Sequence, residues 1–225
     1  MRKGFAEVVF ILDRSGSMRG LEDDTIGGFN AMIEKQRKEE GEAYISAVLF
    51  DDQTELLYDR VPVTNVEPMN NNQYYVRGCT ALLDAVGGAI YHIANIHKYA
   101  REEDRPEKTL FIIITDGMEN SSHIYTYDKV KKMVEKEKKK YGWEFLFLGA
   151  NMDAINVAGR FGIRADRAVN YECDSAGTAL NYQMISETIS AVRRSESRKE
   201  TSIMIDACCA PIREDYKKRH RGKRA

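Results

Sequence analysis

The chain has 225 residues, of which 43% are hydrophobic and 31% charged, and its formal net charge at pH 7 is −1. This composition is typical of a soluble globular protein, and the near-neutral balance excludes a chain-wide electrostatic attraction to nucleic acid or to membranes. The four cysteines form no Cys-x-x-Cys pair, so the sequence favours reduced thiols in a reducing compartment over a zinc site or a disulfide framework.

No apolar stretch approaches the about 20 residues that a membrane span needs. The basic beginning of the chain is not followed by the small-residue cleavage site of a secretory signal. We therefore expect a cytoplasmic protein without a membrane segment. Since no linker divides the chain, we also expect one domain over residues 1–212, followed by a basic C-terminal tail over residues 213–225.

The predicted elements alternate between strand and helix along the chain. Residues 7–12 form a run rich in Val and Ile, which is typical of a strand buried on both faces of a parallel sheet. Hydrophobic spacing and turn residues then predict helices over 21–38, 81–99, 126–140, 152–161 and 175–194, and strands over 44–50, 54–58, 109–115, 143–148 and 168–171.

One pair of strands differs from the rest of this pattern. Strands 44–50 and 54–58 are separated only by Asp51-Asp52-Gln53, and such short spacing across polar turn residues predicts an antiparallel hairpin. The segment 60–75 has no clear period, and we expect an irregular crossing there. The whole pattern predicts an α/β fold with a doubly wound, mainly parallel sheet, one antiparallel strand and helices on both faces.

Oxygen-bearing side chains occur in three loops of this predicted sheet. Asp13, Ser15 and Ser17 follow the first strand, Thr80 precedes a helix, and Asp116 follows the strand 109–115. In an open parallel sheet, these loops lie at the same edge, where the ligands of such folds bind. The sequence therefore predicts that the five side chains converge.

The chemistry of this set predicts a metal ion. Two carboxylates and three hydroxyls without His or Cys suit Mg²⁺ or Mn²⁺ better than zinc, whereas a Ca²⁺ site usually has more carboxylates at closer spacing. Neutral hydroxyls cancel little of the ion's charge, so such an ion attracts an outside anion, for example the Asp or Glu carboxylate of a protein partner. Helix amino ends beside the site favour that anion as well.

Each of the three motifs also has an ordinary structural explanation. Asp-x-Ser-x-Ser is a common composition of turns and caps, Thr80 can serve as a helix N-cap, and Asp116-Gly117 can be a simple turn. The structural explanation requires three coincidences at one edge of the sheet, whereas the metal site explains all three motifs together.

The five residues together resemble the metal-ion-dependent adhesion site of the von Willebrand factor type A (vWA) domain. That site combines an Asp-x-Ser-x-Ser loop with a later Thr and a later Asp followed by Gly. Here the matching residues are Asp13, Ser15, Ser17, Thr80 and Asp116, and the resemblance covers at least residues 7–116. The chain looks most like the intracellular prokaryotic or phage members of the family.

The resemblance implies a Rossmann-like vWA fold, a bound Mg²⁺ and capture of a ligand through an acidic group. It also implies that Ser15, Ser17 and Thr80 bind the metal directly, while the two acids act partly through water.

Polar residues at the same edge are candidates for contacting the ligand. Arg14 and Met18 are the favoured ones because they belong to the first loop, and the others are Met118, Glu119, Asn120, His123, Asn151 and Asp153. An ordinary polar loop explains the latter group equally well. We expect His97, which lies on the inner stripe of the helix 81–99, to be a core residue and not a catalytic base.

Three functions are compatible with these observations. The favoured one is a metal-dependent protein–protein interaction module that is not an enzyme and that binds an acidic group of an unknown protein partner. The second is a Mg²⁺-dependent phosphoryl-transfer or hydrolytic enzyme, although the chain has no Walker-type glycine loop and no Gly-x-Ser-x-Gly motif. The third is a nucleic-acid-associated factor that uses the basic tail, which is less favoured because few aromatic residues accompany its charges.

Overall fold

The fold is built around one six-stranded sheet, which the computed structural model describes within residues 1–221. The strand order is β3-β2-β1-β4-β5-β6, and every neighbouring pair is parallel except β2 with β3. The strands are β1 (Arg2–Asp13), β2 (Glu42–Phe50), β3 (Thr54–Pro62), β4 (Pro106–Thr115), β5 (Glu144–Gly149) and β6 (Ala168–Asn170). The predicted fold class, a mainly parallel sheet with one antiparallel strand, is confirmed.

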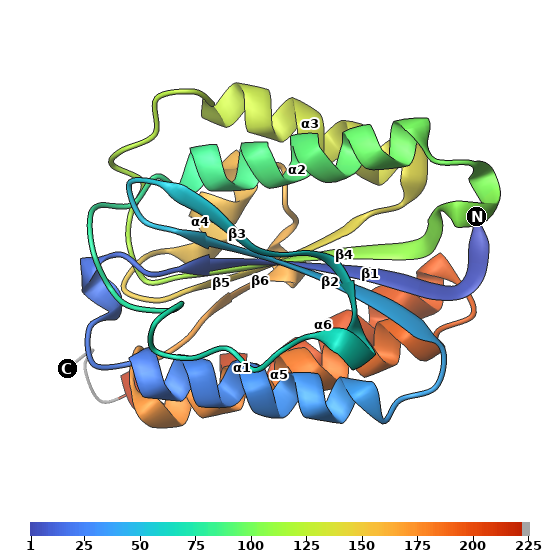
Figure 1. The fold of residues 1–225 in the computed structure, drawn as a ribbon. Helices are drawn as coiled ribbons and strands as arrows, with labels where there is room; N and C mark the ends of the chain where they lie inside the picture. Colours follow the sequence, from blue (N-terminus) through green and yellow to red (C-terminus); the bar gives the residue numbers. More distant parts are fainter. Residues whose placement is uncertain (222–225) are drawn as a thin grey trace.

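Helices cover both faces of the sheet, as Figure 1 shows. They are α1 (Glu22–Arg37), α2 (Leu82–Tyr99), α3 (Tyr127–Tyr141), α4 (Ala154–Arg160), α5 (Ser175–Arg194) and α6 (Arg198–His220). In this view α2 and α3 lie above the sheet, whereas α1, α5 and α6 lie below it. None of the helices within residues 1–221 is long and apolar enough to cross a membrane.

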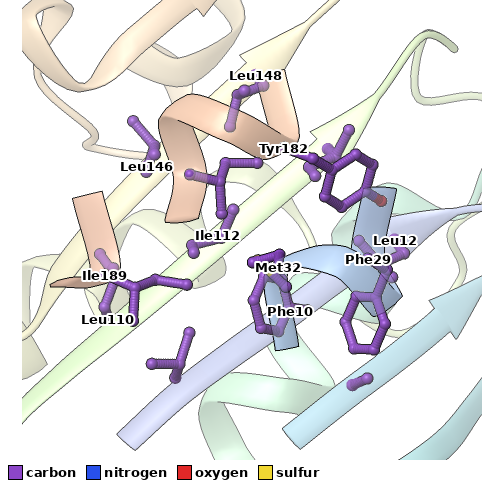
Figure 2. Packing of buried hydrophobic residues seen from close by; sticks show 14 of the residues in the cluster. Phe10, Leu12, Phe29, Met32, Leu110, Ile112, Leu146, Leu148, Tyr182 and Ile189 are labelled. Carbon is purple, nitrogen blue, oxygen red and sulfur yellow. The ribbon is translucent and has the colours of Figure 1, made fainter. Parts of the chain in front are cut away.

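Strand β1 lies in the middle of the sheet and contributes to two separate cores. Side chains alternate between the faces of a strand, so Phe10 and Leu12 enter the core under α1 and α5, while Val9 and Ile11 enter the core under α2 and α3. Figure 2 shows Phe10 close to Phe29 in the first of these cores. Burial on both faces explains why the whole run is apolar.

The structure differs from the sequence prediction at the C-terminal end. A basic tail was expected to leave the domain at residue 213, but α6 continues to His220. The predicted boundary between 212 and 213 therefore falls inside this helix. Residues 222–225 of the predicted tail lie outside the described residues.

Packing explains why α6 forms despite an internal proline, Pro211. The buried side chains Thr201, Ile205, Cys209 and Ile212 recur at helical spacing and form one inner face. This face packs against α5 and β6. Tertiary contacts therefore stabilise a helix whose sequence alone contains a breaker.

Candidate metal centre

The first loop of the site begins where β1 ends. Asp13 is the last residue of the strand and is only 1% exposed. Its Oδ1 accepts a hydrogen bond from the Ser15 backbone N–H at 2.7 Å. The chain then enters a short 3₁₀ turn, η1 (Gly16–Met18), in which the hydroxyls of Ser15 and Ser17 lie 3.0 Å apart. The turn therefore places both hydroxyls beside the buried carboxylate.

The third loop follows β4, the strand next to β1, and is hydrogen-bonded to the first loop. The Ser17 hydroxyl donates to Asp116 Oδ1 at 2.5 Å. The Thr115 hydroxyl donates to Asp13 Oδ2 at 2.5 Å. Since β1 and β4 are parallel neighbours, their carboxyl ends meet at one edge, and this brings residues about a hundred positions apart into contact.

The second loop completes the cluster around Gly117. A Cβ atom built on Gly117 would lie 2.6 Å from the Thr80 Oγ1 and 3.3 Å from each of the Ser15 and Ser17 Oγ atoms. The three hydroxyls therefore converge on the space that the missing side chain of this glycine leaves free. The structure thus brings together all five residues that the sequence singled out.

Backbone hydrogen bonds hold the second loop in place. The Thr80 N–H donates to Asn120 Oδ1 at 2.9 Å, and the Asn120 N–H donates to the Thr80 carbonyl at 3.0 Å. Glu119 Oε2 accepts from the N–H of Leu83, in the first turn of α2, at 2.7 Å. Glu119 and Asn120 therefore fix the loops to one another, and contact of these residues with a ligand stays a prediction.

The structure corrects the two favoured rim candidates. Arg14 and Met18 were the favoured candidates for touching a ligand, but their exposed fractions are 0% and 2%, so that prediction is wrong. Asp153 caps α4 by accepting from the Asn156 N–H at 3.0 Å. By contrast, Met118 is 68% exposed and remains a candidate.

Sequence reasoning missed three residues that support the cluster. Thr115 orients Asp13, as described above. The Tyr74 hydroxyl donates to the Asp13 carbonyl at 2.5 Å, and the Cys173 Sγ donates to Asp116 Oδ2 at 3.4 Å. Only Thr115 had a visible signal, because it is a hydroxyl residue directly before Asp116. Tyr74 lies in the segment that has no periodicity.

The cluster contains two carboxylates and no cationic side chain. Among residues 1–221, no Lys, Arg or His nitrogen lies within 4.0 Å of the carboxylate of Asp13 or Asp116. Arg14 is next to Asp13 in sequence, but its guanidinium pairs with Asp51 at 3.5 Å and with Glu55 at 2.8 Å. The adjacent cation is therefore directed away from the site.

Burial, and to a smaller extent the nearby negative charge, shifts the pKa values of two groups in the cluster. Burial raises the pKa of Asp13, hydrogen bonds from Thr115 and Ser15 lower it, and the nearby Asp116 carboxylate raises it again, with a net upward shift. Burial, helped by Asp116, raises the pKa of the Cys173 thiol to about 12. A positive charge in the cluster would stabilise both carboxylates.

The donors fit a hard divalent cation. Within residues 1–221 there is no group of three or more His, Cys, Asp or Glu side chains that could hold a metal, so a metal at this edge depends on the hydroxyls. Carboxylate and hydroxyl oxygens suit Mg²⁺ or Mn²⁺. The uncompensated charge and the space at Gly117 fit such an ion as well.

Comparison with known proteins identifies the fold. No protein-family model and no curated protein matches the chain. Among solved structures, the vWF domain of the type V pili tip protein Mfa5 from Porphyromonas gingivalis superposes with a TM-score of 0.59 at 12% identity, over 85% of this chain and 97% of that one. The von Willebrand factor type A protein from Catenulispora acidiphila gives 0.53 at 14% identity, over 84% of this chain and 43% of that one.

A further structural neighbour carries a metal at a site of the predicted kind. Proximal thread matrix protein 1 from the mussel byssus was solved with zinc in its metal-ion-dependent adhesion site (MIDAS) motif. It superposes with a TM-score of 0.55 at 14% identity, over 84% of this chain and 46% of that one. The chain spans about half the length of the mussel proteins. These likenesses show that this protein has the vWA fold.

Proposed function

We propose that this protein is a metal-dependent protein-binding module. Asp13, Ser15, Ser17, Thr80 and Asp116 hold Mg²⁺ or Mn²⁺, and an acidic group of a protein partner completes the site. The observation that carries the proposal is the cluster itself, in which three hydroxyls and two carboxylates share one sheet edge without any cationic side chain. The zinc-occupied motif of the mussel protein supports it by likeness of fold.

The hydroxyl and carboxylate side chains of the proposed site have different roles. The hydroxyls of Ser15, Ser17 and Thr80 face the space at Gly117 and are the direct ligands. Asp13 and Asp116 supply negative charge. Asp13 fixes the first loop by accepting from the Ser15 backbone N–H, and Asp116 orients the Ser17 hydroxyl by accepting from it. When bound, the ion supplies a positive charge that neutral hydroxyls leave partly uncompensated, and this charge attracts the partner's carboxylate.

Two observations favour this module over the alternatives. Both oxygens of Asp13 and both oxygens of Asp116 already accept hydrogen bonds, so these carboxylates are engaged in holding the cluster and are poorly placed to act as general bases. At the C-terminal end of α6, Arg219 pairs with Asp174 and Asp215, which neutralises part of the charge that nucleic-acid binding by the tail would use.

A cytoplasmic location is part of the proposal. The side chain of Cys79, next to Thr80, is exposed as a free thiol, and such a thiol persists best in a reducing compartment.

Calorimetric titration with Mg²⁺ and Mn²⁺ tests the site. The Asp13→Ala variant should lose metal binding and keep the fold, because the carboxylate that orients Ser15 is removed while the apolar part of β1 is unchanged. The matched control is Asp206→Ala, which removes an exposed carboxylate on α6 that pairs with Arg213. Unchanged Mg²⁺ affinity in Asp13→Ala would refute the assignment.

The partner is then sought by affinity capture with and without Mg²⁺. Proteins retained by the native protein in Mg²⁺, and lost both in chelator and with Asp13→Ala, are the expected partners. Substituting their exposed Asp and Glu residues should abolish retention. Retention that is equal with and without Mg²⁺ contradicts the proposed mode of binding.

A further inference from the structure

A groove lies between the C-terminal halves of α2 and α3. The two helices run side by side over one face of the sheet (Figure 1). The groove encloses about 360 Å³, and its polar and aromatic lining comes from Tyr91, Asn95, Lys98, Lys136, Glu137 and Lys140. It is separate from the proposed metal centre, because Thr80 precedes the N-terminal end of α2 and the lining begins more than two turns into that helix.

The charge of α3 is unlike that of the chain as a whole. This helix carries seven lysines against three acidic residues, while the whole chain has a formal net charge of −1. Three lysines line the groove, with Lys98 on one wall and Lys136 and Lys140, one turn apart, on the other. Positive charge is therefore concentrated along one cleft, which favours an anionic ligand.

Aromatic rings accompany these lysines. Tyr91 lines the groove and is 60% exposed, so its ring is accessible to a ligand. Tyr141 lines the same groove, and the Lys140 ammonium lies 4.7 Å from the centre of its ring. Lysines beside accessible aromatic faces are the combination that proteins use to bind single-stranded nucleic acid.

A buried carboxylate in the wall distinguishes between anionic ligands. Glu137 is 2% exposed, and its Oε1 pairs with the Lys136 Nζ at 3.0 Å. No donor among residues 1–221 reaches its Oε2, although this atom is buried. A buried acceptor without a partner is unfavourable, and an N–H group of a ligand would satisfy it once the Glu137 side chain turns into the groove that it lines. An acidic polypeptide side chain brings a second carboxylate instead.

We propose that the α2–α3 groove binds single-stranded nucleic acid. Lys98, Lys136 and Lys140 contact phosphates, a base stacks on the exposed ring of Tyr91, and an amino group of a base donates to Glu137. This inference uses none of the five proposed metal ligands and stands independently of them.

Fluorescence anisotropy with a short labelled oligoadenylate tests the groove. The triple variant Lys98→Gln, Lys136→Gln and Lys140→Gln should bind at least about 10-fold more weakly at low salt, and the slope of log affinity against log salt should fall by about 2, since each phosphate contact on a single strand contributes about 0.7. The matched control replaces Lys131, Lys132 and Lys139 with Gln. These residues lie on α3 outside the groove lining, so the change should alter affinity less than about 2-fold.

Stacking is tested separately at Tyr91. Tyr91→Ala should weaken binding by about 5- to 150-fold, the range that stacking on one aromatic ring spans, whereas Tyr91→Phe should retain it because the ring remains. Circular dichroism should show the same fold for both variants, since this side chain is exposed.

Several outcomes would overturn the proposal. Equal losses in the two lysine triples would indicate diffuse attraction to a charged helix. Binding of polyglutamate with no binding of the oligoadenylate would identify an acidic polypeptide as the occupant. Loss of oligoadenylate binding in Asp13→Ala or in chelator would place the binding at the metal centre. If the groove variants bind the oligoadenylate as the native protein does, the groove proposal fails, and the proposed metal site, which is tested by the Mg²⁺ titrations, is unaffected.

Discussion

Two acidic residues on β1, Glu7 and Asp13, are both buried, but their surroundings differ. Glu7 is 0% exposed and has a partner on each oxygen, with the Arg60 guanidinium Nε at 2.6 Å from Oε1 and the His97 Nε2 at 2.5 Å from Oε2. Asp13 is 1% exposed and has hydroxyl and amide donors together with a second carboxylate, that of Asp116.

The difference shows how one strand can carry one buried acid that is paired within the protein and another that is not. A buried charge is tolerated when it is paired and hydrogen-bonded, and the cluster at Glu7 meets that requirement within the protein. The cluster at Asp13 meets it only in part, because residues 1–221 supply hydrogen bonds to it and no positive charge within 4.0 Å. The carboxyl edge of the sheet therefore fits a cation from outside, whereas the cluster at Glu7 requires none.

The largest effect on stability is expected when the Glu7 carboxylate is removed from its cluster with Arg60 and His97. Glu7→Gln leaves Arg60 and His97 without their carboxylate and should lower the free energy of unfolding by about 3–5 kcal/mol, the usual cost of breaking a buried ion pair. Urea unfolding measures this change. Mg²⁺ affinity measured by calorimetry should stay the same in folded protein.

The control for this change is Glu42→Gln, which removes the carboxylate of an exposed ion pair with Arg2. It should cost less than about 1 kcal/mol. If Glu7→Gln and Glu42→Gln lower the free energy of unfolding equally, the proposed contrast between the clusters at Glu7 and at Asp13 is not supported.

A change in the cluster at Asp13 should have the opposite consequence: metal binding is lost and the fold stays intact. Gly117→Ala places a methyl group 2.6 Å from the Thr80 Oγ1, so the three hydroxyls have to move apart. We expect Mg²⁺ affinity to fall by about 10- to 100-fold, as when groups that orient metal ligands are disturbed. Gly27→Ala, on α1, meets no atom within 4 Å and should leave the affinity unchanged.

The smallest expected effect is the pH dependence of the metal-free protein. Because burial raises the pKa of Asp13 above its unfolded value, the folded state binds this proton more tightly than the unfolded state does. The group's contribution to stability is then fully present below the unfolded pKa and is lost as pH rises through the folded pKa.

The measurement is urea unfolding in chelator from about pH 7 down to about pH 5, compared between the native protein and Asp13→Asn. As pH falls, the stability of the native protein should rise relative to that of the variant. Parallel profiles for the two proteins would show that Asp13 is not strained by burial in the absence of a cation.

The elements around the site could be predicted from the sequence because their signals are local. The apolar run before Asp13 and the one before Asp116 each identify a strand, and the polar residue after each run marks its carboxyl end. Parallel strands present these ends at one edge of the sheet. Thr80 lies at the amino end of α2, and the loops before the helices of such a sheet lie at the same edge. No contact between distant side chains had to be known.

The remaining features depend on tertiary contacts that the sequence does not specify. Arg14 follows Asp13, and its partners Asp51 and Glu55 come from the hairpin of β2 and β3. Arg60 reaches Glu7 from a position with φ of 51°, at an irregularity in β3. The inner face of α6 mixes Thr201 and Cys209 with two isoleucines, so its hydrophobic pattern is weak until α5 and β6 cover it.

The central place of β1 has a consequence for synthesis of the protein. Val8 pairs in register with Leu110 of β4, so about a hundred further residues must be made before β1 can close on that side. At a ribosomal rate of about 5–20 residues per second, this takes roughly 5–20 s. During that time one of the most apolar segments of the chain has an unpaired edge, and the nascent protein is a natural client for chaperones that shield such segments.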